Sequence, residues 1–194
     1  MSSAAPSDVR DILEFWFGMA KGLGSPRIEW FRKDPKFDAE IRTRFGALHA
    51  KAASGGLNAW RASPEPMLAL VIVLDQFSRN LYRNDPRAFA QDEMARSCAE
   101  EAIRRKDDLG FIPVQRQFLY LPFEHCEDLA DQDRAVALME SLDAFDETRG
   151  LTAWAEKHRD IIQRFGRFPH RNAILGRPST PGEEEFLKRP GSSF

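Results

Sequence analysis

The sequence predicts an all-α fold in which about eight helices form antiparallel pairs, arranged as a bundle or a short solenoid. Across the 194 residues, apolar side chains recur at helical spacing, and no segment has the period-two alternation of β-branched residues typical of a strand. Residues 67–74 are apolar without a break, which predicts a buried central helix over 67–83. The sequence contains no internal repeat that would decide between a bundle and a solenoid.

The central helix is expected to become polar in its later turns. Ser63 is the expected N-cap, and Pro64 takes the first helical position. Asp75 and Arg79 lie four residues apart on one stripe of this helix, and Asn80 lies on the neighbouring stripe. Because a buried charge is costly unless it is paired, we expect Asp75 and Arg79 to find partners elsewhere in the chain.

Two helices are expected before the central helix, one over residues 7–18 and one over 34–56. Both begin at capping residues and end at glycine. In the connection between them, Trp30 and Phe31 are expected to dock on the core, as large aromatic side chains usually do. His49 stands beside the apolar stripe near the end of the second helix, and we interpret it as a helix-end or surface histidine.

Five further helices are expected after a turn at residues 84–86. Apolar stripes and capping residues indicate helices at 91–106, from Pro113 through 115–133 with a kink or break at Pro122, at 136–145 with Phe145 on the stripe, at 151–165 and at 180–187. Trp154 and His158 share the stripe of the 151–165 helix, and we interpret His158 as a satisfied core residue. The whole chain, 1–194, is expected to form a single domain with a frayed tail after about residue 188.

The composition excludes several classes of protein. A formal net charge of -2 and a pI near 6.1 argue against a general binder of nucleic acid or of anionic membranes. The two cysteines, Cys98 and Cys126, form no CxxC pair, so neither a disulfide framework nor a structural zinc site is indicated. The first ten residues lack the basic start and apolar core typical of a signal peptide, and no apolar run approaches the length that spans a bilayer. We therefore expect a soluble, cytoplasmic protein; its oligomeric state is not indicated.

The densest local group of titratable residues is the segment 123–128, which holds three carboxylates and one imidazole. If this segment is helical, His125 shares an inward stripe with apolar neighbours, Glu124 and Glu127 share the next stripe, and Cys126 faces away. A Cys–His dyad is thereby disfavoured. The structural alternative is a buried histidine that hydrogen-bonds a carboxylate such as Asp75 and joins two helices without any chemistry.

Metal and cofactor sites are not supported by local motifs. None of the four histidines has Glu three residues before it, and HExxH is absent, so we expect neither a metal nor a cofactor. Convergence of Glu, His and Asp from different helices remains the open alternative. GxxxxGK[ST], GxGxxG and GxSxG are absent as well, which leaves nucleotide binding and acyl transfer without motif support.

A second polar group follows the 151–165 helix, where five cationic or potentially cationic side chains fall within fourteen residues. They are Arg164, Arg167, His170, Arg171 and Arg177. Guanidinium groups on a loop suit phosphate or carboxylate, so this segment could hold an anion. The alternative is structural, with these arginines paired to helix C-terminal carbonyls and to Glu124, Glu127 or Asp75.

Several segments together resemble a known bacterial family. They are DVRDILEFWFG, Trp30-Phe31, LDQFSRNLYR, FLYLPFEHCEDLADQ and RFGRFPHRNAILGRPSTPGEEEFL. In this order they resemble the family catalogued as domain of unknown function 924, with Ser78 and Cys126 departing from its expected pattern. The resemblance implies a cytoplasmic, all-helical protein with a tetratricopeptide-repeat-like arrangement and no established activity. It also implies one shared feature made of Asp75, Arg79, Asn80, Glu124, His125, Glu127, His170, Arg171 and Asn172.

Two functions compete on this sequence. The first is a binding or scaffold module for a peptide or a small anionic ligand, with no nucleic-acid or membrane partner. Its candidate ligand contacts are Arg79, Asn80, Glu127, Arg167, His170, Arg171 and Asn172. The alternative is an enzyme in which Asp75, Glu124 or His125 acts as acid and base while arginines hold an anion. Both require Asp75, Arg79, His125 and the 170–172 loop to meet in space.

Overall fold

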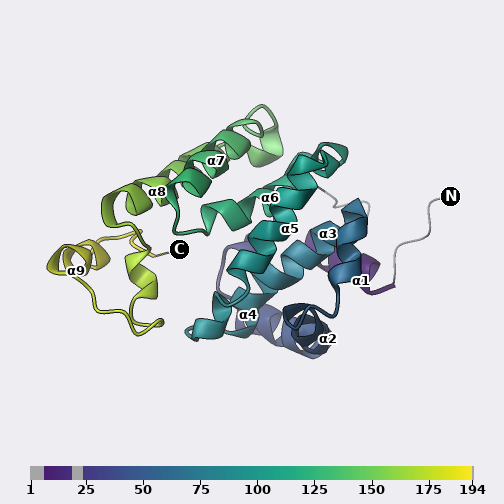
Figure 1. The fold of residues 1–194 in the computed structure, drawn as a ribbon, viewed down its shortest axis with the longest axis horizontal. Helices are drawn as coiled ribbons and strands as arrows, with labels where there is room; N and C mark the ends of the chain where they lie inside the picture. The colour runs from purple at the N-terminus through teal and green to yellow at the C-terminus, as the bar shows by residue number, and fades with distance from the viewer. Residues whose placement is uncertain (1–6, 19–23, 194) are drawn as a thin grey trace.

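The computed structural model describes residues 7–18 and 24–193, and within these ranges it contains helices and no strand (Figure 1). The helices are α1 (Ser7–Phe17), α2 (Pro35–Ala53), α3 (Pro64–Ile72), α4 (Ser78–Leu81), α5 (Asp92–Arg104), α6 (Pro113–Glu124), α7 (Leu129–Glu140), α8 (Leu151–Phe165) and α9 (Pro181–Leu187). The all-α prediction is confirmed. The first six residues of the expected domain and part of the connection before Trp30 lie outside the described ranges.

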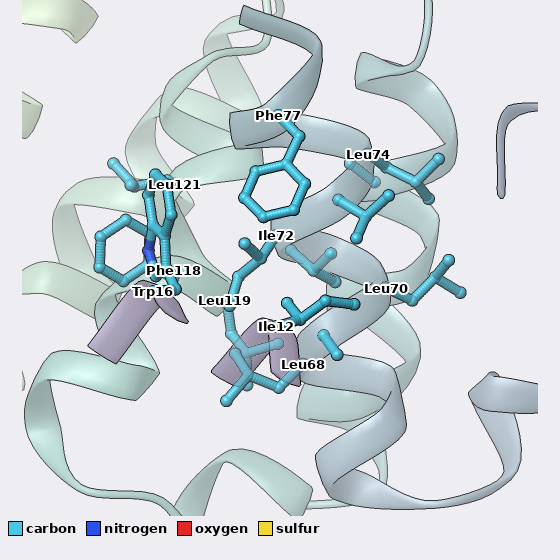
Figure 2. Packing of buried hydrophobic residues seen from close by; sticks show 14 of the residues in the cluster. Ile12, Trp16, Leu68, Leu70, Ile72, Leu74, Phe77, Phe118, Leu119 and Leu121 are labelled. Atoms are coloured by element: carbon cyan, nitrogen blue, oxygen red, sulfur yellow. The ribbon is translucent and has the colours of Figure 1, made fainter. Parts of the chain in front are cut away.

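The central helix is the most buried element, as its unbroken apolar run predicts. Every side chain from Met67 to Leu74 is 0 or 1 % exposed. α3 contacts α1, α5 and α6, so apolar partners surround it on several sides. Figure 2 shows Trp16 of α1 and Phe118 of α6 together on one side of this segment, away from Leu70 and Leu74. A helix without a polar face is stable only inside such an enclosure.

The central helix differs from a regular α-helix at one place. A π segment, Val73–Phe77, joins α3 to α4, so the helix is continuous but wider over these residues. The carbonyl of Leu74 accepts a hydrogen bond from Ser78 Oγ at 2.5 Å, and the carbonyl of Asp75 accepts one from Arg79 Nη1 at 2.9 Å. Polar side chains therefore bond to backbone acceptors at the altered turn. Such π segments are often found at functional sites.

His49 lies near the end of α2, as predicted, but the prediction that it is a surface residue is wrong. His49 is buried, and its Nε2 lies 2.7 Å from Ser78 Oγ. Ser78 donates to the carbonyl of Leu74, so it accepts the hydrogen of His49. The histidine thus ties α2 to the start of α4, a contact that local spacing in α2 could not reveal.

Only half of the predicted aromatic docking occurs. Trp30 is buried and donates from Nε1 to the carbonyl of Trp16 at 2.9 Å. Phe31 is instead 66 % exposed, although its ring lies near that of Phe118. The two residues follow one another through a short 3-10 turn, Ile28–Trp30, and only the first ring reaches the core.

The predicted helix through residues 123–128 ends earlier than expected. α6 continues past Pro122 without a break there and stops at Glu124. Asp128 then caps the next helix, because its side chain accepts hydrogen bonds from the backbone N–H groups of Ala130 and Asp131. The carboxylates and the imidazole of this segment therefore lie at a helix junction rather than along one continuous face.

α7 and α8 lie side by side as a pair (Figure 1). α8 buries His158 together with Ala155 and Ile162, as expected for His158. Trp154, however, is 54 % exposed, and Phe145 at the end of the preceding stripe is exposed too. His158, Ile161 and Ile162 of the predicted stripe are therefore buried, whereas Ala155 is buried in place of Trp154.

None of the helices in the described ranges is both long enough and apolar enough to cross a membrane. The most apolar one, α3, is only 9 residues long and continues into polar turns. Its apolar surface is covered by neighbouring helices of the same chain.

Candidate functional site

Asp75 is the buried centre of the site. Its Oδ1 lies 2.8 Å from Nδ1 of His125 and 3.0 Å from Nη1 of Arg79, and its Oδ2 accepts from Gln76 Nε2 at 2.6 Å. Burial opposes ionisation of this carboxyl group, but the charge of Arg79 and the contact with His125 outweigh burial and hold the pKa of Asp75 below its usual value. Asp75 is therefore a fixed carboxylate with both oxygens engaged.

Asp92 extends the network from α5. It receives two hydrogen bonds from Arg79, at 2.9 and 3.1 Å, in a bidentate pair. Its Oδ2 also lies 3.4 Å from Nη1 of Arg171. A continuous chain of charges thus runs from Asp75 through Arg79 and Asp92 to Arg171, across a separation of 96 residues in sequence.

Arg171 is a buried cation with weak compensation. It lies in a 3-10 turn, Pro169–Arg171, and is 7 % exposed. Its guanidinium carbon lies 4.6 Å from the ring centroids of both Phe89 and Phe168. Burial and then the charge of Arg79 lower the pKa of Arg171 to about 10, although Asp92 opposes this shift. Nε of Arg171 has no hydrogen-bond partner within the described chain.

Glu124 lies behind the site and is protonated at neutral pH. Burial raises the pKa of Glu124 to about 8, and the negative charge of Asp75 acts in the same direction. Its Oε1 is 3.1 Å from Nδ1 of His158, which also lies 2.8 Å from the carbonyl of Trp154. Since burial lowers the pKa of His158 to about 3, Glu124 and His158 meet as two neutral groups.

A pocket of about 360 Å³ opens beside these groups. We call it the His125–Arg171 pocket, after two of the residues in its wall. Its lining comes from α5 and the turn before it, from the end of α6, and from the segment after α8; the charged or titratable side chains in it are Asp92, Glu93, Arg96, His125, Cys126, Glu127 and Arg171. This volume lies within the range typical of small-molecule sites.

The structure brings together only part of the set chosen from sequence. Asp75, Arg79, His125 and Arg171 meet through the network, and Glu127 also lines the pocket. His170 is adjacent to Arg171, and burial together with the charge of Arg171 lowers the pKa of His170 to about 4. The expected convergence therefore occurs for Asp75, Arg79, His125 and Arg171, but not for the whole 170–172 loop.

Three other candidates hold the fold together elsewhere. Asn80 donates to Asp38 of α2 at 2.8 Å. Arg167 forms a bidentate pair with Glu183 of α9, at 2.6 and 2.8 Å, and Asn172 donates to Ser179 at 3.0 Å. None of the three is in the wall of the pocket.

Glu127 fixes the C-terminal segment beside the pocket. It accepts two hydrogen bonds from Arg177, at 2.6 and 2.9 Å, and one from the backbone N–H of Phe168 at 2.8 Å. Arg177 in turn donates to the carbonyl of Phe168 at 3.2 Å. Arg177 thus pairs with Glu127, as the structural alternative for the loop arginines expected. Arg167 pairs with Glu183 instead, and Arg171 has only its longer contact with Asp92.

Sequence reasoning missed two residues that shape the site. Asp92 is the link between both arginines, and Phe89 contacts both guanidinium groups. Asp92 was visible only as an acidic residue in the first turn of a helix, which is where helix-stabilising acids ordinarily occur. Nothing local distinguishes it from such an acid.

The described side chains include no group of three or more His, Cys, Asp or Glu residues that could hold a metal ion. The expectation of a metal-free protein stays a prediction, which elemental analysis of dialysed protein would check. The chemistry present is that of charged, hydrogen-bonding and proton-accepting groups.

The fold and site define an all-helical protein with a small, charged pocket lined by three segments of one chain. The chain belongs to the family described as bacterial protein of unknown function (DUF924), whose model matches residues 12–191. The resemblance noted from the sequence motifs is thereby confirmed.

A solved structure of a protein of unknown function, ATU0120 from Agrobacterium tumefaciens, is similar to this chain. The two are 42% identical and superpose with a TM-score of 0.82, and the alignment covers 93% of this chain and 96% of that chain. No curated protein matches the chain.

Proposed function

We propose that this protein binds a small anionic ligand in the His125–Arg171 pocket and that Arg171 holds the anion. The observation that carries the proposal is the weak compensation of Arg171. Its cation is buried against the rings of Phe89 and Phe168, and its ion pair with Asp92 is long at 3.4 Å. A buried charge in such surroundings is costly, and an anion in the pocket would offset that cost.

The partners of Asp92 and Glu127 support this choice. Asp92 is already bound by Arg79, and Glu127 by Arg177. Those carboxylates are therefore not available to neutralise Arg171 fully. A carboxylate or phosphate group matches the donors of a guanidinium and would give Arg171 a closer counter-charge than Asp92 does.

A small ligand fits the pocket better than a peptide does. A volume of about 360 Å³ accommodates a compact molecule, whereas a peptide needs an extended groove. The alternative of a peptide-binding scaffold depends on the tetratricopeptide-repeat-like arrangement that the resemblance implies. The pairing of α7 with α8 is compatible with that arrangement. We favour the small ligand because the residues of its site can be named individually.

We also propose that the protein is cytoplasmic, because its two cysteines are free.

An enzyme that uses the acid–base groups of the same pocket is the second candidate. The contact between His125 and Asp75 favours it, because a carboxylate-bound imidazole at a pocket wall can accept a proton. Anion binding is common to both candidates, so it is tested first.

The test is a thermal-shift titration of the full chain with inorganic phosphate, pyrophosphate, acetate and citrate, each against sodium chloride at equal ionic strength. A ligand present at ten times its Kd stabilises the folded state by about 1.4 kcal/mol, which is roughly 3–6 °C for a chain of this size. Arg171→Gln should remove the shift. Arg149→Gln, which changes an exposed arginine far from the pocket wall, should keep it.

Two results would contradict the proposal. One is the absence of any shift with the whole panel, and the other is an equal shift in wild type and Arg171→Gln. A large loss of melting temperature in Arg171→Gln without any anion would instead assign Arg171 a structural role.

A further inference from the structure

His125 makes a hydrogen bond whose direction is set by its partner. The ring lies at the C-cap of α6, and its Nδ1 is 2.8 Å from Oδ1 of Asp75. Asp75 remains ionised because Arg79 and His125 outweigh the effect of burial on its pKa. An ionised carboxylate only accepts hydrogen bonds, so Nδ1 carries the hydrogen. In the neutral ring, Nε2 then carries a lone pair.

The Nε2 edge of the ring is available to the pocket. None of the described residues hydrogen-bonds Nε2, and the His125 side chain keeps 16% of its surface exposed while lining the pocket. Burial, followed by the charge of Arg79, lowers the pKa of His125 despite the opposing effect of Asp75. These effects favour the neutral form of the ring.

Asp75 is well fixed for orienting this ring. Both of its oxygens are occupied, since Arg79 and His125 share Oδ1 and Gln76 binds Oδ2. The carboxylate lies in the π segment, whose neighbouring carbonyls are themselves bonded by Ser78 and Arg79. A second group that fixes the tautomer and orientation of a histidine is the usual requirement for acid–base work by imidazole.

We infer that His125 is the general base of a reaction on a small organic anion held in the pocket by Arg171, with Asp75 as its positioning residue. This inference rests on the proposed function, because the anion site places the substrate. The substrate class is a carboxylate or phosphate ester that gives up a proton from an O–H or C–H group near its charged end. Arg171 and His125 line the same pocket, so such a molecule can contact both.

The proton transfer balances within the site. The lone pair of Nε2 forms a bond to the substrate proton, and the electron pair of the broken bond stays on the substrate. The imidazolium so formed lies against the Asp75 carboxylate, and the new negative charge on the substrate shares the pocket with the Arg171 guanidinium. Return of the proton to the product or its leaving group restores the neutral ring. No electrons enter or leave the protein.

Charged and titratable groups face His125 from every neighbouring element. They are Asp75 from the π segment, Arg79 from α4, Asp92 from α5, Glu127 from its own segment, Arg171 from the turn after α8, and His158 from α8. The positive charge of Arg79 lowers the proton affinity of the ring, and the negative charges of Asp75 and Asp92 raise it. Removing the charge of Asp75 should therefore lower the pKa of His125 further.

The first test is the tautomer of His125 in the full ¹⁵N-labelled chain, read from long-range proton–nitrogen correlations and assigned with the His125→Gln variant. We expect a neutral ring protonated at Nδ1 at pH 7. A ring protonated at Nε2, or an imidazolium at pH 7, would overturn the assignment of His125 as base. Anion binding measured by thermal shift does not depend on this result.

The second test is carbethoxylation by diethyl pyrocarbonate, which reacts with unprotonated imidazole nitrogen. At pH 7, His125 should react at least tenfold faster than His49 and His158, which are both buried. Asp75→Asn should shift the pH profile of modification to lower pH; if that variant does not fold, the wild-type tautomer decides the point. An His125 that reacts no faster than His49 would overturn the inference.

Inorganic phosphate separates this inference from the proposed function. At 20 mM it should slow modification of His125 at least fivefold in the wild type and have no effect in Arg171→Gln. If His125 of the wild type reacts rapidly but phosphate does not protect it, the anion site is contradicted. The availability of Nε2 is then still supported. If phosphate protects His125 but the ring is protonated at Nε2, the assignment of His125 as general base is wrong, whereas the anion site is supported.

Discussion

Nδ1 of His125 lies 2.8 Å from Oδ1 of Asp75, a residue fifty positions earlier in the chain. The contact joins the C-terminal end of α6 to the π segment of the central helix. It links the most buried helix of the protein to a residue of the pocket wall. A change at Asp75 should therefore affect both the stability of the core and the state of His125.

Asp75→Asn is expected to destabilise the protein by about 3 kcal/mol, because it leaves Arg79 buried with one counter-charge fewer. The free energy of unfolding in urea, followed by tryptophan fluorescence, measures the effect. Asp146→Asn is the matched control, since that carboxylate pairs with Arg149 in solvent and should contribute little. Equal stability of the two variants would contradict the central role of Asp75.

Glu124 should make the protein less stable as the pH rises. Its pKa is about 8 in the folded state, against an ordinary value of 4.5, so between these values the folded state holds a proton that the unfolded chain has released. Its contribution is complete below pH 4.5 and is lost as the pH rises through 8. Glu124→Gln, which mimics the neutral acid, should be more stable than wild type at pH 8.5 by about 4 kcal/mol.

The comparison at pH 8.5 needs a control for general charge effects. Glu156→Gln removes an exposed carboxylate from α8 and should follow the wild-type pH profile. If Glu124→Gln also follows that profile between pH 5 and 8.5, Glu124 is ionised at neutral pH and the description of the site is wrong.

Much of the fold could be predicted because the apolar pattern determines it locally. The run from 67 to 74 has no polar face, so its burial followed from sequence alone. The capping box at Thr180 and Glu183 is likewise local, and the structure contains it. The end of α6 at Glu124 was missed because Asp128 can serve either inside a helix or as an N-cap, and periodicity does not distinguish the two.

The site was predictable only through its polar residues on apolar stripes. Asp75 and His125 each had to find a partner in the interior, and they found one another. Asp92 lay outside that reasoning because it is half-exposed in the first turn of a helix. Asn80 and Arg167 are paired too, but with Asp38 and Glu183. The cost of burying a polar group predicts that it has a partner, but not which residue that partner is.

Leu70→Asp or Leu74→Asp should abolish soluble expression, because either change places an unpaired charge at a position that is 0 or 1 % exposed. The measurement is the fraction of protein in the soluble lysate. Leu109→Asp is the control, as Leu109 is 62 % exposed and should tolerate the charge. Folded, well-expressed protein carrying Asp at position 70 or 74 would disprove the enclosure of the central helix.

The final prediction concerns Arg177, which holds the segment after α8 against the end of α6. Its guanidinium binds Glu127 at 2.6 and 2.9 Å, and it also donates to the carbonyl of Phe168. Arg177→Ala leaves Glu127 half-buried without its main counter-charge and should cost about 2 kcal/mol, roughly 4–8 °C in Tm. Differential scanning calorimetry measures the change.

The same variant should weaken anion binding although Arg177 is not in the pocket wall, because Phe168 supports the guanidinium of Arg171. Arg149→Ala, which removes an exposed arginine, should change neither property. Arg171→Gln should show the opposite balance, with a small change in Tm and a complete loss of the phosphate shift. If Arg177→Ala and Arg171→Gln lose the same amounts of stability and binding, the two arginines do not have the separate roles that their partners indicate.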